Sequence, residues 1–293
     1  MSTESVGARY RGLDAWPSRD ILDVFIEGQM AAVAAVRAAA PAIEAAAEAV
    51  TARMKAGGRL VYVGAGTSGR LALLDGVELT PTFDWPAERV VYLLAGGEVA
   101  LIRAVEGAED DREAGQRDIA NAKVTAADAV IAVAASGSTP YTLAALEAGR
   151  ARGALGIAIA NNPDAPLLAA AEHPILLDTG TEAIGGSTRM KAGTAQKATL
   201  NLLSSLVMTR LGRVHDGYMV DLRATNSKLR RRSERMLTEM TGATAEAARD
   251  ALERCAGRVK PAVLVLKGLT PDAADRALAN AGGSLRRALQ KTA

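Results

Sequence analysis

The chain has 293 residues, of which 49% are hydrophobic and 23% are charged, and this composition excludes disordered, collagen-like and coiled-coil proteins. Its 35 Lys and Arg residues nearly balance 33 Asp and Glu residues. The resulting net charge of +2 gives no electrostatic case for nucleic acid or a membrane surface as the main partner.

Few residues are available for metal or disulfide chemistry. The single cysteine, Cys255, excludes an internal disulfide and a cysteine metal cluster, and the two histidines, His173 and His215, argue against a histidine metal site. No metal is therefore expected. The polar N-terminus lacks the apolar stretch of a signal peptide, which predicts a cytoplasmic protein.

The first region, residues 1–57, is predicted to be a polar arm followed by helices that pack on the core. Alanine dominates Ser18–Met54, and alanine is the strongest helix former. A bend is expected at Pro41, and Gly57 and Gly58 end the helical pattern.

Short apolar runs separated by glycine and small polar residues follow in residues 58–235. Five of them are continuous enough to be buried parallel strands: Arg59–Gly64, Val90–Gly97, Ala129–Ser136, Gly156–Pro163 and Pro174–Gly180. Helical patterns alternate with them: Ser68–Asp75, Val99–Asn121, Pro140–Arg152, Ala165–Ala171 and Met190–Leu211. The alternation predicts an α/β fold with a doubly wound five-stranded parallel sheet. The strand pattern then disappears, and residues 236–293 are predicted to be a small helical domain with Thr244 and Thr270 as helix N-caps.

The loop after the first predicted strand, residues 64–70, reads Gly-Ala-Gly-Thr-Ser-Gly-Arg and opens into a helix. It matches the G-x-G-x-x-G pattern of dinucleotide-binding proteins, but the next strand ends in Leu94-Ala95-Gly96-Gly97 without the acid that would hold a ribose. The missing acid weakens the dinucleotide interpretation, and no organic cofactor is expected.

A second loop of similar chemistry, residues 135–140, follows the third predicted strand and also opens a helix. One such loop is accounted for by ordinary helix capping, but two at the same edge of a parallel sheet favour a phosphorylated small molecule. The candidate phosphate-binding residues are Gly66, Thr67, Ser68, Ser136, Gly137, Ser138 and Thr139.

The paired loops resemble the sugar isomerase (SIS) domain family, a group of phosphosugar-binding α/β sandwiches. The resemblance implies that hydroxyls at Ser68, Ser136 and Thr139 hold the sugar phosphate. Ala134 stands where the family's second motif begins with serine, so one phosphate contact is missing. Ser138 is the candidate replacement.

Acidic side chains follow the same edge. Glu78 has apolar sequence neighbours, so burial is expected to raise its pKa and keep it protonated, whereas Glu109 follows small residues that would let a ligand approach. Asp110, Asp111 and Glu113 are interpreted as a solvated helix face.

Longer stretches resemble the N-acetylmuramic acid 6-phosphate etherase family across almost the whole chain, most specifically EGAEDDRE and STRMKAGTAQK. DGVELTPTFD departs from the family's usual sequence but keeps the glutamate. The resemblance implies a lyase of cell-wall amino sugar recycling that releases D-lactate and N-acetylglucosamine 6-phosphate without a cofactor. It also implies Glu78 as proton donor, Glu109 as base, and a homodimer with the site near the subunit seam.

Two further residues are reserve candidates. Glu182 matches a catalytic glutamate of related aldose–ketose isomerases, and Lys191, like Arg189, is a candidate contact for phosphate or the lactate carboxylate. An equally good interpretation is that Lys191 and Arg189 are charged residues at the start of a helix that lies in a subunit contact. Two alternatives to the etherase function remain. The protein could be an isomerase that uses Glu182, or a non-catalytic regulator resembling glucokinase regulatory protein. His215 is interpreted as an interface histidine.

Overall fold

The computed structural model describes residue 3, residues 5–222 and residues 227–292. Contacts along the chain separate two compact units. The sheet unit comprises Met1–Val77 and Ala87–Leu206, and the helical unit comprises Glu78–Pro86 and Val207–Ala293. The division expected from the sequence, at residues 57/58 and 235/236, stays a prediction.

The N-terminal arm contains two short 3-10 helices, η1 (Ala8–Tyr10) and η2 (Leu13–Ala15), and leads into α1 (Ser18–Ala38) and α2 (Ala40–Lys55). The helical pair breaks at Ala39 rather than at Pro41, because Pro41 lies in the first turn of α2, where its missing N–H costs no hydrogen bond. Among the described residues no single helix is long and apolar enough to span a membrane; α1 and α2 reach that length and composition only together, across a bend of 57°.

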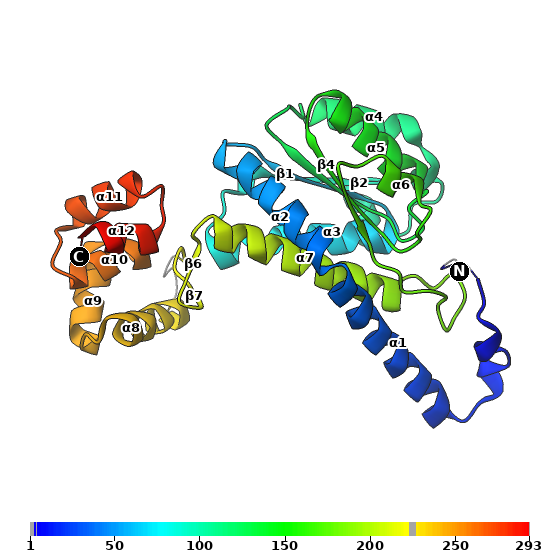
Figure 1. The fold of residues 1–293 in the computed structure, drawn as a ribbon, viewed down its shortest axis with the longest axis horizontal. Coiled ribbons are helices and arrows are strands. Elements are labelled where there is room, and N and C mark those ends of the chain that lie inside the picture. Colours follow the sequence, from blue (N-terminus) through cyan, green and yellow to red (C-terminus); the bar gives the residue numbers. More distant parts are fainter. Residues whose placement is uncertain (1–2, 4, 223–226, 293) are drawn as a thin grey trace. The chain divides into compact units, whose positions relative to one another are not determined.

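The five predicted strands form one parallel sheet, which confirms the doubly wound α/β fold (Figure 1). They are β1 (Leu60–Gly64), β2 (Val90–Leu94), β3 (Ala129–Val133), β4 (Leu155–Ala160) and β5 (His173–Leu176). Their order is β2-β1-β3-β4-β5, so the chain changes direction across the sheet between β1 and β3. Ligands of open α/β sheets bind at the carboxyl ends of strands beside such a switch point.

Helices cover both faces of the sheet, with α2, α3 and α7 on one side and α4, α5 and α6 on the other (Figure 1). Their bounds are Gly66–Phe83 for α3, Arg112–Asn121 for α4, Pro140–Ala151 for α5, Pro166–Ala169 for α6 and Lys191–Arg210 for α7. Single 3-10 turns connect some of these elements: η3 (Ala87–Arg89), η4 (Glu98–Leu101) and η5 (Ala108–Asp110).

Two helix predictions need correction. The helix expected to end at Asp75 continues to Phe83 with Pro81 inside it. The single helix expected over Val99–Asn121 is instead η4, η5 and α4, because Gly107 takes a left-handed conformation at φ 70° and Asp111 caps α4 by accepting the N–H of Ala114.

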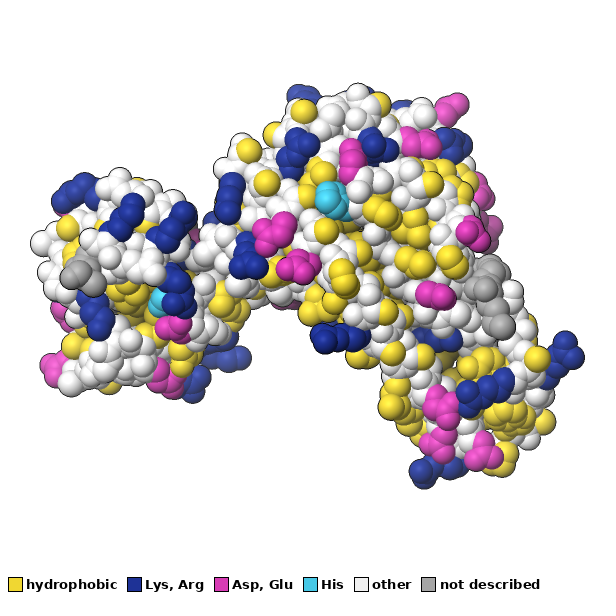
Figure 2. Space-filling model, viewed as in Figure 1, with side chains coloured by type: hydrophobic (Ala, Val, Ile, Leu, Met, Phe, Trp, Pro, Cys, Tyr) yellow, Lys and Arg dark blue, Asp and Glu magenta, His cyan; other side chains and the backbone are white. Residues whose placement is uncertain are grey.

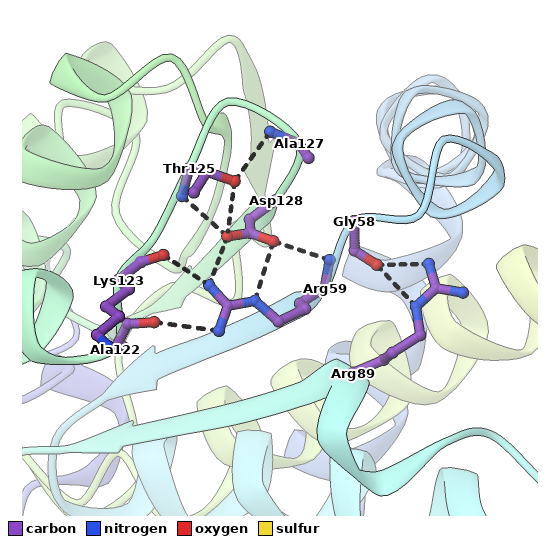
Figure 3. Close-up of polar contacts among 8 residues, drawn as sticks. All are labelled: Gly58, Arg59, Arg89, Ala122, Lys123, Thr125, Ala127 and Asp128. Atoms are coloured by element: carbon purple, nitrogen blue, oxygen red, sulfur yellow. Dashed lines mark hydrogen bonds and ion pairs between the residues drawn. The ribbon is translucent and has the colours of Figure 1, made fainter.

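The amino edge of the sheet is closed by the Arg59–Asp128 ion pair (Figure 3). Asp128 accepts hydrogen bonds from the Arg59 backbone N–H at 2.9 Å, from Arg59 Nη2 at 2.7 Å and from the Thr125 N–H at 2.9 Å. The Arg59 guanidinium also donates to the carbonyls of Ala122 and Lys123, and Arg89 Nε donates to the Gly58 carbonyl. The starts of β1 and β3 are therefore joined by hydrogen bonds in which the Arg59 guanidinium, the Asp128 carboxylate and the nearby backbone groups all find partners.

The helical unit contains a two-stranded hairpin, β6 (Val214–His215) and β7 (Tyr218–Met219), which is not among the elements predicted from the sequence. Buried His215 contacts Asp216 at 3.5 Å, and burial lowers the pKa of this histidine. Helix α8 (Ser227–Thr241) follows. Residues 207–293 contain 17 Lys and Arg against 9 Asp and Glu, and basic side chains gather on this unit in Figure 2.

The remaining helices repeat one hairpin at an offset of 26 residues. Helices α9 (Ala245–Arg254) and α10 (Val259–Leu266) correspond to α11 (Pro271–Asn280) and α12 (Leu285–Thr292). The predicted N-caps are confirmed, since Thr244 and Thr270 accept the N–H groups of Ala247 and Ala273. Cys255 is buried in the shared core, as expected.

Candidate functional site

An open cavity of about 500 Å³ lies at the carboxyl edge of the sheet. Four segments contribute to its wall: the loop after β1, the loop after β3, the 3-10 turn η5 and the segment before α7. The lining residues are Ala65, Gly66, Thr67, Ser68, Glu109, Asp110, Ala134, Ala135, Ser136, Ser138, Thr139, Pro140, Gly186 and Thr188. Both hydroxyl loops predicted from the sequence therefore face one cavity.

The first loop turns directly from β1 into α3. A Cβ atom on Gly69 would lie 2.7 Å from the carbonyl carbon of Gly64, so the glycines let the helix pack against the strand end. Because α3 begins at Gly66, its leading N–H groups have no acceptor one turn earlier. Those N–H groups and the hydroxyls of Thr67 and Ser68 are neutral donors of the kind that suits an anion.

The second loop offers hydroxyls that are not used as caps. Thr139 precedes α5 without a side-chain capping bond, which argues against helix capping as its purpose. Ser136 Oγ accepts the Ser138 N–H at 3.2 Å, so the hydroxyl hydrogen of Ser136 is left to donate to a ligand. Ala134 presents only a methyl group to the cavity, and Ser138 lines the same wall.

Gly137 shapes the turn of the second loop. It does not belong to the cavity lining, and its N–H is donated to the Ala134 carbonyl at 3.1 Å. Its φ of 67° lies in the left-handed region, and a Cβ would lie 2.3 Å from the Cβ of Ala165. Only glycine fits this position without strain, and a phosphate contact by Gly137 stays a prediction.

The carboxylates are placed differently from one another. Glu109 and Asp110, both exposed on η5, line the cavity, whereas the sequence pattern predicts that Asp110 lies on a solvated helix face. Glu78 lies on α3 and is exposed, so the expected burial is wrong. Successive residues of a helix point about 100° apart, and buried Leu79 beside Glu78 in sequence faces a different direction.

Glu182 and Lys191 do not belong to the lining of this cavity. The Glu182 carboxylate is only 1% exposed and accepts the N–H groups of Lys191 at 3.3 Å and Ala192 at 2.9 Å, which fixes the start of α7. Burial raises the pKa of Glu182 and lowers the pKa of Lys191. Thr188 and Gly186, just before this helix, complete the cavity, and neither was predicted.

No lysine or arginine belongs to the cavity lining within the described parts of the chain. Likewise, the described residues contain no group of three or more His, Cys, Asp and Glu side chains that could hold a metal ion. The cavity thus combines hydroxyl and N–H donors, which suit phosphate oxygens, with two carboxylates, one of which could take a proton from a bound molecule.

The fold and the cavity define a sugar isomerase (SIS) domain protein. The model for the glucokinase regulatory protein N-terminal SIS domain matches residues 42–150, and the SIS domain model matches residues 110–206. A phosphoheptose isomerase structure from Francisella tularensis is 21% identical, with a TM-score of 0.48, and the match covers 66% of this chain and 97% of that chain.

Relatives of nearly full length narrow this class. An N-acetylmuramic acid 6-phosphate etherase from Deinococcus radiodurans is 54% identical over 98% of this chain and 94% of its own length. A second etherase, from Streptomyces avermitilis, is 46% identical over 99% of this chain and 93% of its own length. The chain belongs to the N-acetylmuramic acid 6-phosphate etherase family, and the regulator alternative is not favoured.

Proposed function

We propose that this chain cleaves the D-lactyl ether of N-acetylmuramic acid 6-phosphate, giving N-acetylglucosamine 6-phosphate and D-lactate. Identity of 54% to a named etherase over 98% of the chain carries the proposal. The reaction is an elimination followed by addition of water, so the enzyme is a carbon–oxygen lyase. We place it in the cytoplasm, in recycling of cell-wall amino sugars, and expect a homodimer.

The phosphate is bound by the two hydroxyl loops. Thr67 and Ser68 on one side, and Ser136, Ser138 and Thr139 on the other, donate to its oxygens, while Gly66 and Gly137 shape the loops. Neutral donors at helix N-termini hold an anion without a cationic side chain. This arrangement is supported by their common position around one cavity of about 500 Å³.

Glu109 and Glu78 carry out different proton transfers. In the ring-opened substrate the C1 aldehyde makes the C2 proton acidic, and Glu109 removes it. The C2–H electron pair stays on C2 as a carbanion that the C1 aldehyde stabilises. It then forms the C2–C3 double bond as the C3–O bond breaks, and Glu78, the proton donor that the family resemblance implies, protonates the departing lactyl oxygen. Water then adds its hydroxyl to C3 and returns a proton to C2. No oxidant or reductant is needed.

Glu182 and Lys191 support the wall that carries Thr188. Their absence from the cavity lining favours this supporting role over ring opening by Glu182, because both side chains are buried and Glu182 already accepts two backbone N–H groups. An isomerase reaction through Glu182 is the second candidate, and its product would be a ketose phosphate without lactate.

The decisive experiment incubates the purified protein with N-acetylmuramic acid 6-phosphate and measures D-lactate. Stoichiometric release of D-lactate and N-acetylglucosamine 6-phosphate is expected. Binding of the sugar phosphate without lactate release would contradict the proposal and favour a regulator, and a ketose product would favour the isomerase. Solvent deuterium at C2 tests the carboxylates separately: Glu109→Gln should abolish exchange, and Glu78→Gln should stop lactate release while some exchange remains.

A further inference from the structure

Asp75 is a buried carboxylate that the proposed reaction does not use. It lies on α3 with 4% of its surface exposed, and three side chains donate hydrogen bonds to it. Tyr62 Oη donates to Oδ2 at 3.0 Å, and Asn201 Nδ2 and Ser204 Oγ donate to Oδ1 at 2.6 and 3.1 Å. Burial raises the pKa of Asp75, although these three donors and nearby Lys197 act in the opposite direction.

These donors connect the elements that lead to the cavity. Tyr62 is on β1, which runs into the first hydroxyl loop, and Asn201 and Ser204 are on α7, which follows Thr188. Asp75 is on α3, whose first turn contains Thr67 and Ser68. One carboxylate therefore ties together a strand and two helices whose ends form three parts of the cavity wall.

The position of α3 over the sheet is fixed by close packing at the next residue. A Cβ on Gly76 would lie 2.6 Å from Cε1 of Tyr92 and 2.9 Å from Cε2 of Tyr62, so the helix rests directly on these two rings. The rings are stacked, with centroids 6.3 Å apart. Packing at Gly76 sets the depth of the helix, and the directional bonds of Asp75 set its rotation.

We propose that Asp75 is a positioning residue, which holds α3 so that Thr67 and Ser68 keep the orientation needed for lactate release. The inference rests on the proposed function. Its role is geometric: the hydrogen bonds matter, and the negative charge does not. A displacement of about 1 Å at a reacting group can cost about 100-fold in rate, so loosening this helix has a measurable effect.

Two substitutions separate geometry from charge. Asp75→Asn keeps the oxygen that accepts from Asn201 and Ser204, and its NH2 group can donate to Tyr62 Oη, since a phenol oxygen also accepts. Asp75→Ala leaves all three donors without an acceptor. We expect kcat for lactate release to stay within about 3-fold of wild type for Asp75→Asn and to fall about 10- to 100-fold for Asp75→Ala.

Asp128→Ala is the matched control, because it also removes a buried, fully bonded carboxylate from the sheet unit, but at the opposite edge of the sheet. It is expected to lower stability while leaving kcat per folded molecule unchanged. Hydrogen exchange of the α3 backbone amides supplies a readout independent of activity. Protection should fall in Asp75→Ala and be retained in Asp75→Asn.

The outcomes are distinguishable. Equal loss of lactate release in Asp75→Asn and Asp75→Ala, with α3 amides still protected in both, would show that the charge is required and would overturn the positioning role. Wild-type kcat in a folded Asp75→Ala variant would overturn it as well. If the wild-type protein itself releases no lactate, the proposed function fails, and the amide-exchange contrast alone then decides whether Asp75 fixes α3.

Discussion

The two edges of the parallel sheet differ in how their polar groups are used. At the amino edge, Arg59 and Asp128 satisfy each other and the backbone groups around them, and charge is cancelled within the protein. At the carboxyl edge, the hydroxyls of Ser136 and Thr139 face an open cavity that no lysine or arginine lines among the described residues. The same sheet thus carries a hydrogen-bonded ion pair at its amino edge and hydroxyl donors that face a cavity at its carboxyl edge.

This difference separates stability from function. A buried carboxylate that loses its partners destabilises the fold, whereas a hydroxyl that faces a cavity contributes little until a ligand arrives. Substitutions at the amino edge should therefore change unfolding, and substitutions at the carboxyl edge should change catalysis or binding. Each of the following predictions would break or sharpen that separation.

The largest expected effect is on catalysis by Glu109. Glu109→Gln should lower the rate of D-lactate release about 10²- to 10⁴-fold, because an amide cannot take the C2 proton. The free energy of unfolding should change by no more than about 0.5 kcal/mol, since Glu109 is exposed. Exposed Glu113 of α4, which pairs with Arg117, is the control, and Glu113→Gln should retain the wild-type rate. Wild-type turnover by Glu109→Gln would remove this residue from the site.

At the other edge, Asp128→Ala should lower the free energy of unfolding by about 3–5 kcal/mol, because the guanidinium of Arg59 and two backbone N–H groups lose their acceptor. Chemical denaturation measures this change. Asp23→Ala, which breaks the exposed Arg19–Asp23 pair, should cost less than about 1 kcal/mol. Equal effects of the two substitutions would show that the amino edge is not specially stabilising.

A smaller effect is expected from the phosphate loop. Ser136→Ala should raise KM about 10-fold while changing kcat less, because a hydrogen bond to a charged oxygen contributes about 1.5–3 kcal/mol to binding. Steady-state kinetics with the phosphorylated substrate checks this prediction. Ser205→Ala, on the exposed surface of α7, serves as the control. An unchanged KM would exclude Ser136 as a phosphate contact.

The smallest effect is the acid sensitivity of the amino edge. Burial alone would raise the pKa of Asp128, but hydrogen bonds from Arg59 and Thr125 outweigh it and hold this pKa below its ordinary value. A carboxyl group with a depressed pKa stabilises the folded state fully above its unfolded pKa of about 3.9, and this contribution is lost as pH falls through the folded pKa. Asp128→Asn should therefore lose less stability than wild type below about pH 4, measured by thermal unfolding. Parallel pH profiles of the two proteins would contradict this.

The strands and the two hydroxyl loops were predictable because their signals are local. Each strand is a continuous apolar run, and each loop places its hydroxyls directly after a strand, so a parallel sheet brings them to one edge. The 26-residue repeat was equally local, since Ala-Ala-x-x-Ala-Leu occurs at residues 247–252 and again at residues 273–278, and a search for periods would have found it.

Other site features depend on tertiary structure. Thr188 reaches the cavity because buried Glu182 fixes the start of α7, and no sequence pattern reports that contact. The exposure of Glu78 follows from the rotation of α3, which apolar neighbours in sequence do not determine. Asp110 lines the cavity because Gly107, at φ 70°, breaks the helix that would have continued through this segment.

The repeated hairpins have a consequence for the order in which the chain folds. Each hairpin closes its contacts over one short segment, since Thr244 caps α9 and α10 ends at Leu266. The sheet instead pairs Leu60 with Ala129, across an intervening segment that contains α3, β2 and α4. Low contact order favours rapid folding, and long-range parallel pairing is slow. The helical hairpins are therefore expected to fold before the sheet, and the long-range pairing of the sheet strands sets the pace at which these two units become native.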